Sequence, residues 1–520
     1  MDHKERLILL AFNQYFLFLL FRSLSRGEKF FSLKQVLQKN MTQQPLPHVD
    51  PEAFRTYGKE VVDWIADYLK HTEDYPVLAQ VNPGDIKKQL PTAPPAAPEG
   101  MDTILADFQR IIMPGITHWN HPAFFAYFAN SASAPGILGE MLCTALNVNS
   151  MLWRTSPSAT ELEEVVLQWL RQMIGLPKNF KGVIIDTASV STLVALTAAR
   201  EATQKRIREE GLAGRTDLPK LRLYISDQTH SSGEKAGLVL GIGQNNVIKI
   251  PSDNIFRMDV NALEAAIAED KKNGFLPFAV MATIGTTATT SIDPLPEIAA
   301  ICEREKIWLH VDGAYGGSWA VMPEMKHVLK GCEFADSMVV NPHKSLLTPM
   351  DCSVLFTRHV DTLKRAFSLV PEYLKTSDGD ATNFMDWGVQ LGRRFRALKL
   401  WFIIRSYGVD GIAARLREHC RLAKEFASWI EADENYERIA PVNFSVVCFR
   451  VHPKNISDEA VLEKLNVNII NAINATGEAF LAGTKLNGRF VIRLAIGNAA
   501  TTEKQVRRVW ELIQQNAVLE

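Results

Sequence analysis

The chain has 520 residues, of which 57 are basic and 58 acidic, so its formal net charge is −1. This balance excludes the basic surplus that nucleic-acid or membrane-surface binding requires. An apolar content of 47% over this length is enough for at least one large buried core with smaller attachments. The six cysteines form no CxxC pair, so we expect no metal site, no disulfide framework and a cytoplasmic location.

The chain begins with an apolar run over residues 7–21 between charged flanks. It is shorter than the roughly 20 residues that a membrane-spanning helix needs, and Asn13 and Gln14 interrupt it. A signal-like or interfacial segment is the alternative. We expect residues 1–45 to be an appended leader, because no later apolar span or disulfide pattern supports secretion.

Residues 46–125 are predicted to form an N-terminal helical arm. From Pro51 onward, apolar residues recur at helical spacing, at Val62, Ile65 and Leu69. The proline-rich residues 90–98 predict an extended linker. Such an arm is too small to bury its own apolar face, so a partner subunit is the natural surface for it to pack on.

Short β-rich runs alternate with helical stretches between residues 160 and 368. This alternation predicts an α/β fold with a mostly parallel sheet and helices on both faces, and such sheets bind ligands where their strands end. We expect residues 126–420 to form this large domain and residues 421–520 a small C-terminal α+β domain. The predicted strands are Val183–Ile185, Leu221–Ile225, Phe278–Ala282, Ile307–Val311, Ser337–Val340 and Ser353–Phe356.

A lysine and an aspartate each follow one of these strands. Lys344 comes after Ser337–Val340, and Asp312 comes after Ile307–Val311. An enzyme that uses pyridoxal 5'-phosphate needs this pair, because the amine binds the cofactor covalently and the carboxylate keeps the pyridine nitrogen protonated. The small Ala314 leaves room for the ring. In isolation, Asp312 is equally consistent with a helix or turn cap.

Three weaker features point to the same cofactor. Ala188 and Ser189 open a helix after a strand, where backbone N–H groups and a hydroxyl can receive a phosphate, although an ordinary N-cap has the same pattern. His230 follows another strand and can lie against a flat ring, although a loop histidine is more often structural. Thr286 lies in a Gly-Thr-Thr turn that suits close approach to a cofactor, and such turns are also common elsewhere.

These positions lie within a larger set of motifs. The set resembles the group II pyridoxal-phosphate decarboxylases, and within them the aromatic-L-amino-acid decarboxylases, over about residues 50–515. The motifs are His118–Pro122, Phe124–Phe128, Thr160–Glu163, His230–Ser232, Asn341–Lys344, Asp351–Ser353 and Leu391–Arg396.

The resemblance implies a homodimer of PLP fold type I with active sites at the subunit interface. It makes Lys344 the cofactor-binding lysine, Asp312 the partner of the pyridine nitrogen and His230 the residue that stacks on the ring. The other residues that it implies for cofactor binding are Ala188, Ser189, Thr286, Ala314, Asn341 and His343. For the substrate pocket it implies Trp119, Tyr127 and Phe128.

The chain departs from the family pattern at four positions that could alter pocket shape or cofactor affinity. The family usually has Trp, Gly, Glu and Ala there. This chain has Ser345, Asp186, Val190 and Gly313.

The predicted reaction is decarboxylation of an aromatic L-amino acid to its arylalkylamine and carbon dioxide. In the family, a tyrosine on a mobile loop is associated with protonation of Cα, and Tyr373 matches its position. The family's aldehyde synthases typically have phenylalanine there or lack the histidine, so Tyr373 and His230 favour amine formation. Gly392 leaves space for an indole, which favours tryptophan, with tyrosine or DOPA next.

Three alternatives remain open. An aromatic aldehyde synthase has the same fold and combines decarboxylation with oxidative deamination. A transaminase or lyase uses the same electron sink. A catalytically inactive relative with a binding role would be expected to lack the lysine, the aspartate or the histidine, and this chain has all three.

Overall fold

The computed structural model describes residues 50–369 and 381–517. The chain divides into two units, Met1–Asp67 and Tyr68–Glu520. Within the first unit, the described residues belong to the amphipathic helix α3 (Pro51–Lys70), which continues to the start of the second. The apolar leader predicted for residues 1–45 lies outside the described residues.

The second unit is built around a seven-stranded sheet with the order β1-β7-β6-β5-β4-β2-β3. β7 is antiparallel to both of its neighbours, and the other adjacent strands are parallel. The mostly parallel sheet predicted from the sequence is therefore confirmed. Its strands are β1 (Lys181–Ile185), β2 (Leu221–Ser226), β3 (Val247–Ile250), β4 (Leu276–Thr283), β5 (Trp308–Asp312), β6 (Ser337–Val340) and β7 (Ser353–Thr357).

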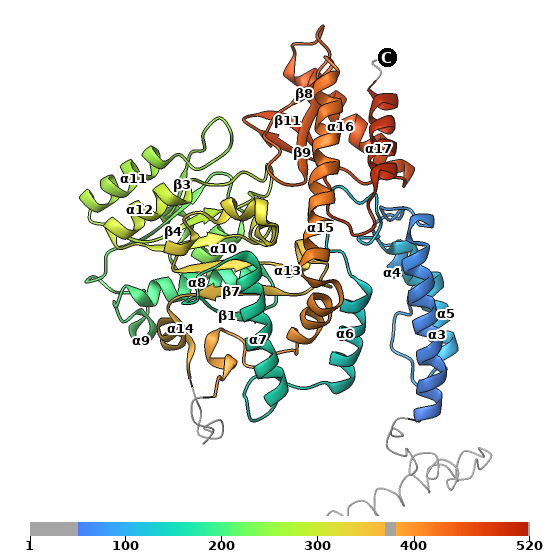
Figure 1. The fold of residues 1–520 in the computed structure, drawn as a ribbon, viewed down its shortest axis with the longest axis horizontal. Helices are drawn as coiled ribbons and strands as arrows, with labels where there is room; N and C mark the ends of the chain where they lie inside the picture. Colours follow the sequence, from blue (N-terminus) through green and yellow to red (C-terminus); the bar gives the residue numbers. More distant parts are fainter. Residues whose placement is uncertain (1–49, 370–380, 518–520) are drawn as a thin grey trace, which may run out of the picture. The chain divides into compact units, whose positions relative to one another are not determined.

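Side chains alternate between two apolar cores, one on each face of this sheet. In β1, for example, Ile184 faces one core while Val183 and Ile185 face the other. A sheet covered on both faces explains why its strands are nearly continuous apolar runs. Figure 1 shows the covering helices around the strands, among them α7 (Pro157–Ile174), α8 (Ala188–Ala202), α10 (Ser232–Val239), α11 (Val260–Lys272), α12 (Leu295–Glu305) and α14 (Val360–Phe367).

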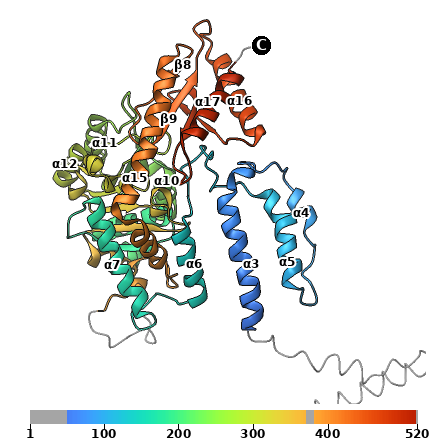
Figure 2. The same cartoon turned by 45° about the vertical axis from the view of Figure 1, so that its right-hand side comes forward.

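A second sheet of four strands has its own apolar core. The helix α15 (Ala397–Ala432) contributes its first half to the core of the large sheet and its second half to this smaller core. Figure 2 shows α15 reaching from the large sheet to the second one. The strands and helices of this region are β8 (Tyr436–Arg438), β9 (Val446–Val451), β10 (Ala482–Leu486), β11 (Arg489–Ala495), α16 (Glu459–Thr476) and α17 (Glu503–Asn516).

The remaining helices are short or lie near the start of the described chain: α4 (Asp85–Gln89), α5 (Met101–Asp107), α6 (Ala134–Leu146), α9 (Ile207–Glu210) and α13 (Pro342–Ser345). Across residues 50–369 and 381–517, no helix combines the length and the apolar character needed to cross a membrane.

All six strands predicted for the large sheet are present, with bounds shifted by at most a few residues. The sequence analysis missed β3, whose four residues include a lysine and give too weak a pattern to separate from a loop. The predicted domain boundaries at residues 46, 126 and 421 stay a prediction.

Candidate active site

Asp312 and Lys344 lie at the same edge of the large sheet. Asp312 is the last residue of β5, and Lys344 lies in α13, directly after the neighbouring parallel strand β6. The two groups are close enough for the Asp312 carboxylate to raise the pKa of the lysine. The structure thus brings together the two residues that the sequence places after strands, and their roles toward a cofactor stay a prediction.

The Lys344 amine lies beside an aromatic ring and near two charged side chains. Burial lowers its pKa, the carboxylate of Asp312 opposes this shift, and the positive charge of Arg493 lowers the pKa further. The amine Nζ lies 5.0 Å from the centre of the Phe128 ring. A lysine whose pKa is lowered in this way has more of the neutral amine that attacks a carbonyl group.

Phe128 is fixed by contacts on its ring. Tyr315 stacks against it with ring centres 3.8 Å apart and an interplanar angle of 17°. The guanidinium of Arg493 lies 4.6 Å from the centre of the Phe128 ring. Since the Tyr315 hydroxyl is hydrogen-bonded to Ser445 Oγ at 2.9 Å, the stacked pair is anchored to the smaller sheet.

The sequence analysis did not single out Arg493, and it found no arginine that would serve as a clamp for an acidic substrate. Arg493 is buried in β11, where Nη1 donates to the Ala126 carbonyl at 2.9 Å and Nε to the Ala288 carbonyl at 3.2 Å. Its Nη2 is buried and has no hydrogen-bond partner among the described residues. A lone charge in the apolar run Phe490–Ile496 was the signal that could have identified it.

The Asp312 carboxylate is buried, with 6% of the residue exposed. Its Oδ1 accepts a hydrogen bond from the backbone N–H of Ala314 at 3.0 Å, which fixes its orientation. The Ala314 carbonyl accepts from the backbone N–H of Asn341, so the segments after β5 and β6 are tied together. Ala314 is therefore small and also lies next to the segment that carries Lys344.

Asn341 and His343 form a buried polar pair. His343 Nδ1 accepts from the backbone N–H of Cys352 at 3.0 Å, and burial lowers the His343 pKa to about 4, so the neutral ring has its proton on Nε2. The Asn341 amide lies 3.2 Å from Nε2, and a protonated Nε2 requires the amide oxygen to face it. The amide's other end is buried without a partner in the described chain. With that orientation, an NH₂ group is available to donate to a phosphate.

The first turn of α8 follows β1 after two residues, as the sequence analysis predicted. Ser189 is exposed there, and Ala188 is partly buried. The backbone N–H groups at a helix start have no partner within the helix. Farther along α8, Ser191 Oγ contacts Ser353 Oγ at 2.8 Å, which fixes this turn beside β7.

His230 lies after β2 and is exposed. Its Nδ1 accepts from the backbone N–H of Ser232 at 3.2 Å and contacts Ser232 Oγ at 3.0 Å, so the ring is oriented. Partial desolvation lowers the His230 pKa, Asp312 raises it, and Lys344 lowers it, which places His230 in the same electrostatic environment as that pair.

Thr286 follows β4 and is fully buried. Its hydroxyl accepts from the backbone N–H of Ser291 at 3.0 Å and contacts Thr289 Oγ1 at 3.0 Å. The hydroxyl therefore stabilises its own turn. A contact with the cofactor stays a prediction.

Phe128 is the predicted substrate residue that lies against Lys344. Trp119 and Tyr127 stack on each other with ring centres 5.9 Å apart, and 38% and 50% of their surfaces are exposed. Gly392 is also exposed, and a Cβ there would come no nearer than 3.9 Å to Asn149 Nδ2, so a larger residue would fit. Tyr373 lies outside the described residues.

Two departures from the family pattern have local explanations. A Cβ on Gly313 would lie 2.5 Å from Met338 Cε and 3.0 Å from the Val339 carbonyl oxygen, so an alanine here would require the Met338 side chain and β6 to shift. Asp186 accepts from Gln390 Nε2 at 2.7 Å and ties the segment before α8 to the segment before Gly392. Ser345 is buried with its hydroxyl unpaired among the described residues, and nothing in the structure explains Val190.

The site residues suit a pyridine aldehyde phosphate. The amine of Lys344 suits the aldehyde, and the buried carboxylate of Asp312 suits the ring nitrogen. The start of α8 and the buried Asn341 amide suit the phosphate, and the His230 imidazole suits the ring face. The described residues contain no cluster of His, Cys, Asp and Glu that would hold a metal ion.

Comparison with known proteins adds to this geometry. Residues 83–452 match the family model described as the pyridoxal-dependent decarboxylase conserved domain. Tryptophan decarboxylase 2 of Oryza sativa subsp. japonica is 41% identical over 90% of this chain and 95% of its own length. A phenylacetaldehyde synthase of a Rosa hybrid cultivar is 40% identical over 94% of this chain and 98% of its own length.

Among solved structures, that of Oryza sativa TDC with PLP and tryptamine matches with a TM-score of 0.87 and 37% identity. The match covers 92% of this chain and 99% of that one. Amine-forming and aldehyde-forming relatives are thus almost equally similar to this chain.

Proposed function

Because the chain belongs to the pyridoxal-dependent decarboxylase family, and within it to the aromatic-L-amino-acid decarboxylases, we propose that it converts aromatic L-amino acids to arylalkylamines and carbon dioxide. The observation that carries this proposal is the placement of Lys344 and Asp312 at neighbouring strand ends, with the Phe128 ring beside the amine. Pyridoxal 5'-phosphate supplies the electron sink that accepts the electron pair left when carbon dioxide departs.

The residues have separate roles in this proposal. Lys344 would hold the cofactor covalently through its amine. Asp312 keeps a proton on the pyridine nitrogen, because a buried carboxylate favours the positively charged partner beside it. His230 covers the ring face, while the start of α8 and the Asn341 amide bind the phosphate.

Amine is proposed as the product in preference to aldehyde. His230 is present and oriented by Ser232, and Tyr373 supplies a phenolic proton for Cα in the family's pattern. Aldehyde formation is the second candidate, favoured by the 40% identity to the rose phenylacetaldehyde synthase. The two reactions differ in their use of dioxygen, since only the aldehyde route consumes it.

An aromatic side chain is the proposed specificity. The aromatic surfaces of Trp119, Tyr127 and Phe128 suit a flat apolar group, and the open space at Gly392 suits an indole. Arg493, whose Nη2 has no hydrogen-bond partner among the described residues, would suit an acidic side chain. Phe128 lies against its guanidinium, and the aromatic decarboxylases among the relatives outweigh this single charge.

A homodimer is the proposed assembly. Four apolar residues of α6 are at least 40% exposed although the helix packs on α15, and burying them against a second copy would remove this apolar surface from water. These residues are Leu138, Met141, Leu142 and Leu146. The apolar residues of α3 suit the same role, since none of that helix is buried.

A cytoplasmic location is also proposed. All six cysteines are free, and five of them, for example Cys302 and Cys352, have thiol pKa values raised by burial well above the usual range. Free buried thiols are typical of proteins from reducing compartments.

The proposal is tested by incubating the cofactor-loaded protein with tryptophan, tyrosine, DOPA, phenylalanine and glutamate and identifying products by mass. We expect carbon dioxide and an arylalkylamine, with tryptophan turned over fastest and glutamate not at all. A keto acid without carbon dioxide would indicate a transaminase. Products from glutamate alone would show that Arg493, and not the aromatic residues, sets the specificity.

A further inference from the structure

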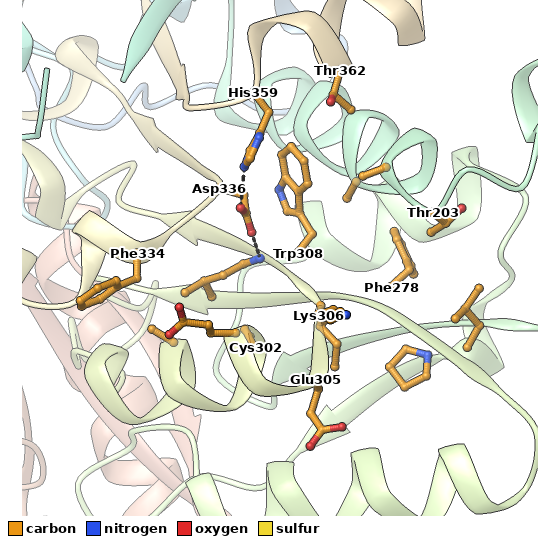
Figure 3. A pocket seen from close by; sticks show the side chains of 18 of the residues that line it. Thr203, Phe278, Cys302, Glu305, Lys306, Trp308, Phe334, Asp336, His359 and Thr362 are labelled. Atoms are coloured by element: carbon orange, nitrogen blue, oxygen red, sulfur yellow. Dashed lines mark hydrogen bonds and ion pairs between the residues drawn. The ribbon is translucent and has the colours of Figure 1, made fainter. Parts of the chain in front are cut away.

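A cavity of about 690 Å³ opens at the edge of the large sheet where β4 and β5 begin (Figure 3). Parallel strands all begin at one edge of a sheet and end at the opposite edge. Lys344 follows the end of β6, so the cavity lies at the opposite edge of the sheet from Lys344. Its volume lies within the roughly 300–1,000 Å³ that is usual for small-molecule sites. The proposed reaction uses none of its lining residues.

One wall of the cavity is aromatic. Trp308 and Phe278 are 7% and 3% exposed, and Figure 3 shows both beside the open space. The His359 ring packs on Trp308 with ring centres 5.0 Å apart and is held by Asp336 at 2.7 Å. Such a wall offers apolar ring edges against which an aromatic ligand can pack.

The rim of the cavity has a surplus of positive charge. Lys271 is paired with Glu305 at 2.6 Å, and Arg358 with Asp336 at 3.2 Å. Lys205 and Lys306 also line the cavity, and neither has an ion-pair partner in the part of the chain that the structure describes. Glu303 lines the cavity as well, and its carboxylate also has no ion-pair partner among these residues. In addition, the Nε of Arg358 is buried without a hydrogen-bond partner there. These groups suit an anion.

A buried polar chain links the aromatic wall to the active site. Trp308 Nε1 donates to Ser337 Oγ at 2.9 Å, and the Ser337 hydroxyl is hydrogen-bonded to His310 Nδ1 at 2.9 Å. Trp308, His310 and Asp312 lie two residues apart from one another along β5, so their side chains point to the same face of the sheet. Burial lowers the pKa of His310 to about 4, and the charge of Asp312 opposes that shift. A displacement of the Trp308 indole therefore changes the hydrogen bonds of Ser337 and His310, and with them the surroundings of Asp312.

We propose that this cavity is a second, regulatory binding site for an aromatic carboxylate, and that its occupancy is transmitted to Asp312 through Trp308, Ser337 and His310. The ligand's ring lies on Trp308 and Phe278, and its carboxylate lies between Lys205 and Lys306. A ligand here alters the surroundings of the carboxylate that faces the cofactor without entering the substrate pocket.

The test is calorimetric titration of the cofactor-loaded protein with indole-3-propionate, which has no amino group and is not turned over. We expect two equivalents to bind per chain, one at the active site and one in the cavity. In the double variant Lys205→Glu/Lys306→Glu, the cavity affinity falls at least tenfold, while the other site and the basal rate are unchanged. The matched control Lys272→Glu/Lys330→Glu alters two exposed lysines outside the cavity and binds two equivalents. A single equivalent for the wild-type protein, or two unaltered sites in the cavity variant, would overturn the proposal.

Transmission is tested with Trp308→Phe, which keeps an aromatic ring and removes the indole N–H. The wild-type holoenzyme is expected to show a shift in visible cofactor absorption when the cavity fills, and the variant is expected to bind without that shift. An equal shift in the variant would overturn the proposed route through Ser337 and His310.

Discussion

Arg393 Nη2 donates to Glu163 Oε1 at 2.6 Å, and both side chains are buried, with 6% and 2% exposed. The two residues belong to the motifs Leu391–Arg396 and Thr160–Glu163, whose relation the sequence does not reveal. Glu163 also accepts from the backbone N–H of Ile184 at 2.8 Å, and Arg393 donates to the Ile184 carbonyl at 2.9 Å. The pair thus fixes the segment that follows Gly392 to α7 and β1.

Breaking this pair is expected to destabilise the protein. Glu163→Ala leaves the Arg393 charge buried without a partner, so the free energy of unfolding should fall by about 3–5 kcal/mol. Urea unfolding measures the loss. The exposed pair of Arg417 and Glu324 is the control, since Arg417→Ala should cost no more than about 1 kcal/mol. Equal effects of the two variants would contradict the assigned role.

Acid is expected to destabilise the protein through three buried histidines, His310, His343 and His419, whose pKa values burial lowers to about 4. An unfolded histidine has a pKa of about 6.5. Between about pH 6.5 and 4, these three histidines are therefore protonated in the unfolded chain and neutral in the folded chain. Stability is therefore fully present above pH 6.5 and falls as pH falls towards 4, by about 1.4 kcal/mol per pH unit for each histidine.

The slope is checked by urea unfolding at several pH values between 6.5 and 5. His419→Gln keeps a donor for the Asn498 carbonyl, which His419 Nε2 contacts at 2.9 Å, and removes one titrating group. The slope should become shallower by about one proton in this variant. An unchanged slope would show that His419 does not stay neutral in the fold.

Removing the charge of Arg493 is expected to raise the pKa of Lys344, because that charge contributes to lowering it. In Arg493→Met, the pH midpoint for covalent attachment of the cofactor, followed by visible absorption, should move upward. Stability should fall by about 1–3 kcal/mol for the hydrogen bonds lost. Arg489→Met, in the same strand but more exposed, is the control and should leave the midpoint in place. A downward shift for Arg493→Met would contradict the account.

Replacing Tyr373 by phenylalanine is expected to divert the product. Without the phenolic proton, amine output should fall by roughly 100-fold, and aldehyde, ammonia and peroxide should appear while dioxygen is consumed. An oxygen electrode and product masses measure this. Tyr407→Phe, at a tyrosine on α15 that is 38% exposed, serves as the control. Unchanged amine output from Tyr373→Phe would remove the basis for assigning the proton to this residue.

The strands of the large sheet and their mostly parallel arrangement were the part of the fold that could be predicted from the sequence. The apolar runs before Asp312 and Lys344 predicted buried strands, and the rule that parallel strands end at one edge then predicted that the two residues meet. Contacts between distant segments could not be predicted in this way. Arg493 is 367 residues from its partner Ala126, and Arg393 is 230 residues from Glu163, so a single sequence has no periodicity that links them.

The role of a hydroxyl was equally hidden. Thr286 has the residue type and the position of a cofactor contact, yet its oxygen is engaged by Ser291 and Thr289 in its own turn. Composition predicts which groups are available near a strand end, and only the folded backbone decides which of them already have partners.

The most direct test of the central claim is to reduce the cofactor-loaded protein with borohydride, digest it and locate the cofactor by peptide mass spectrometry. The account predicts that the cofactor is attached at Lys344 and that Lys344→Ala has neither the attachment nor the decarboxylase activity. Attachment at another lysine, or an unmodified peptide containing Lys344 in an active preparation, would contradict it.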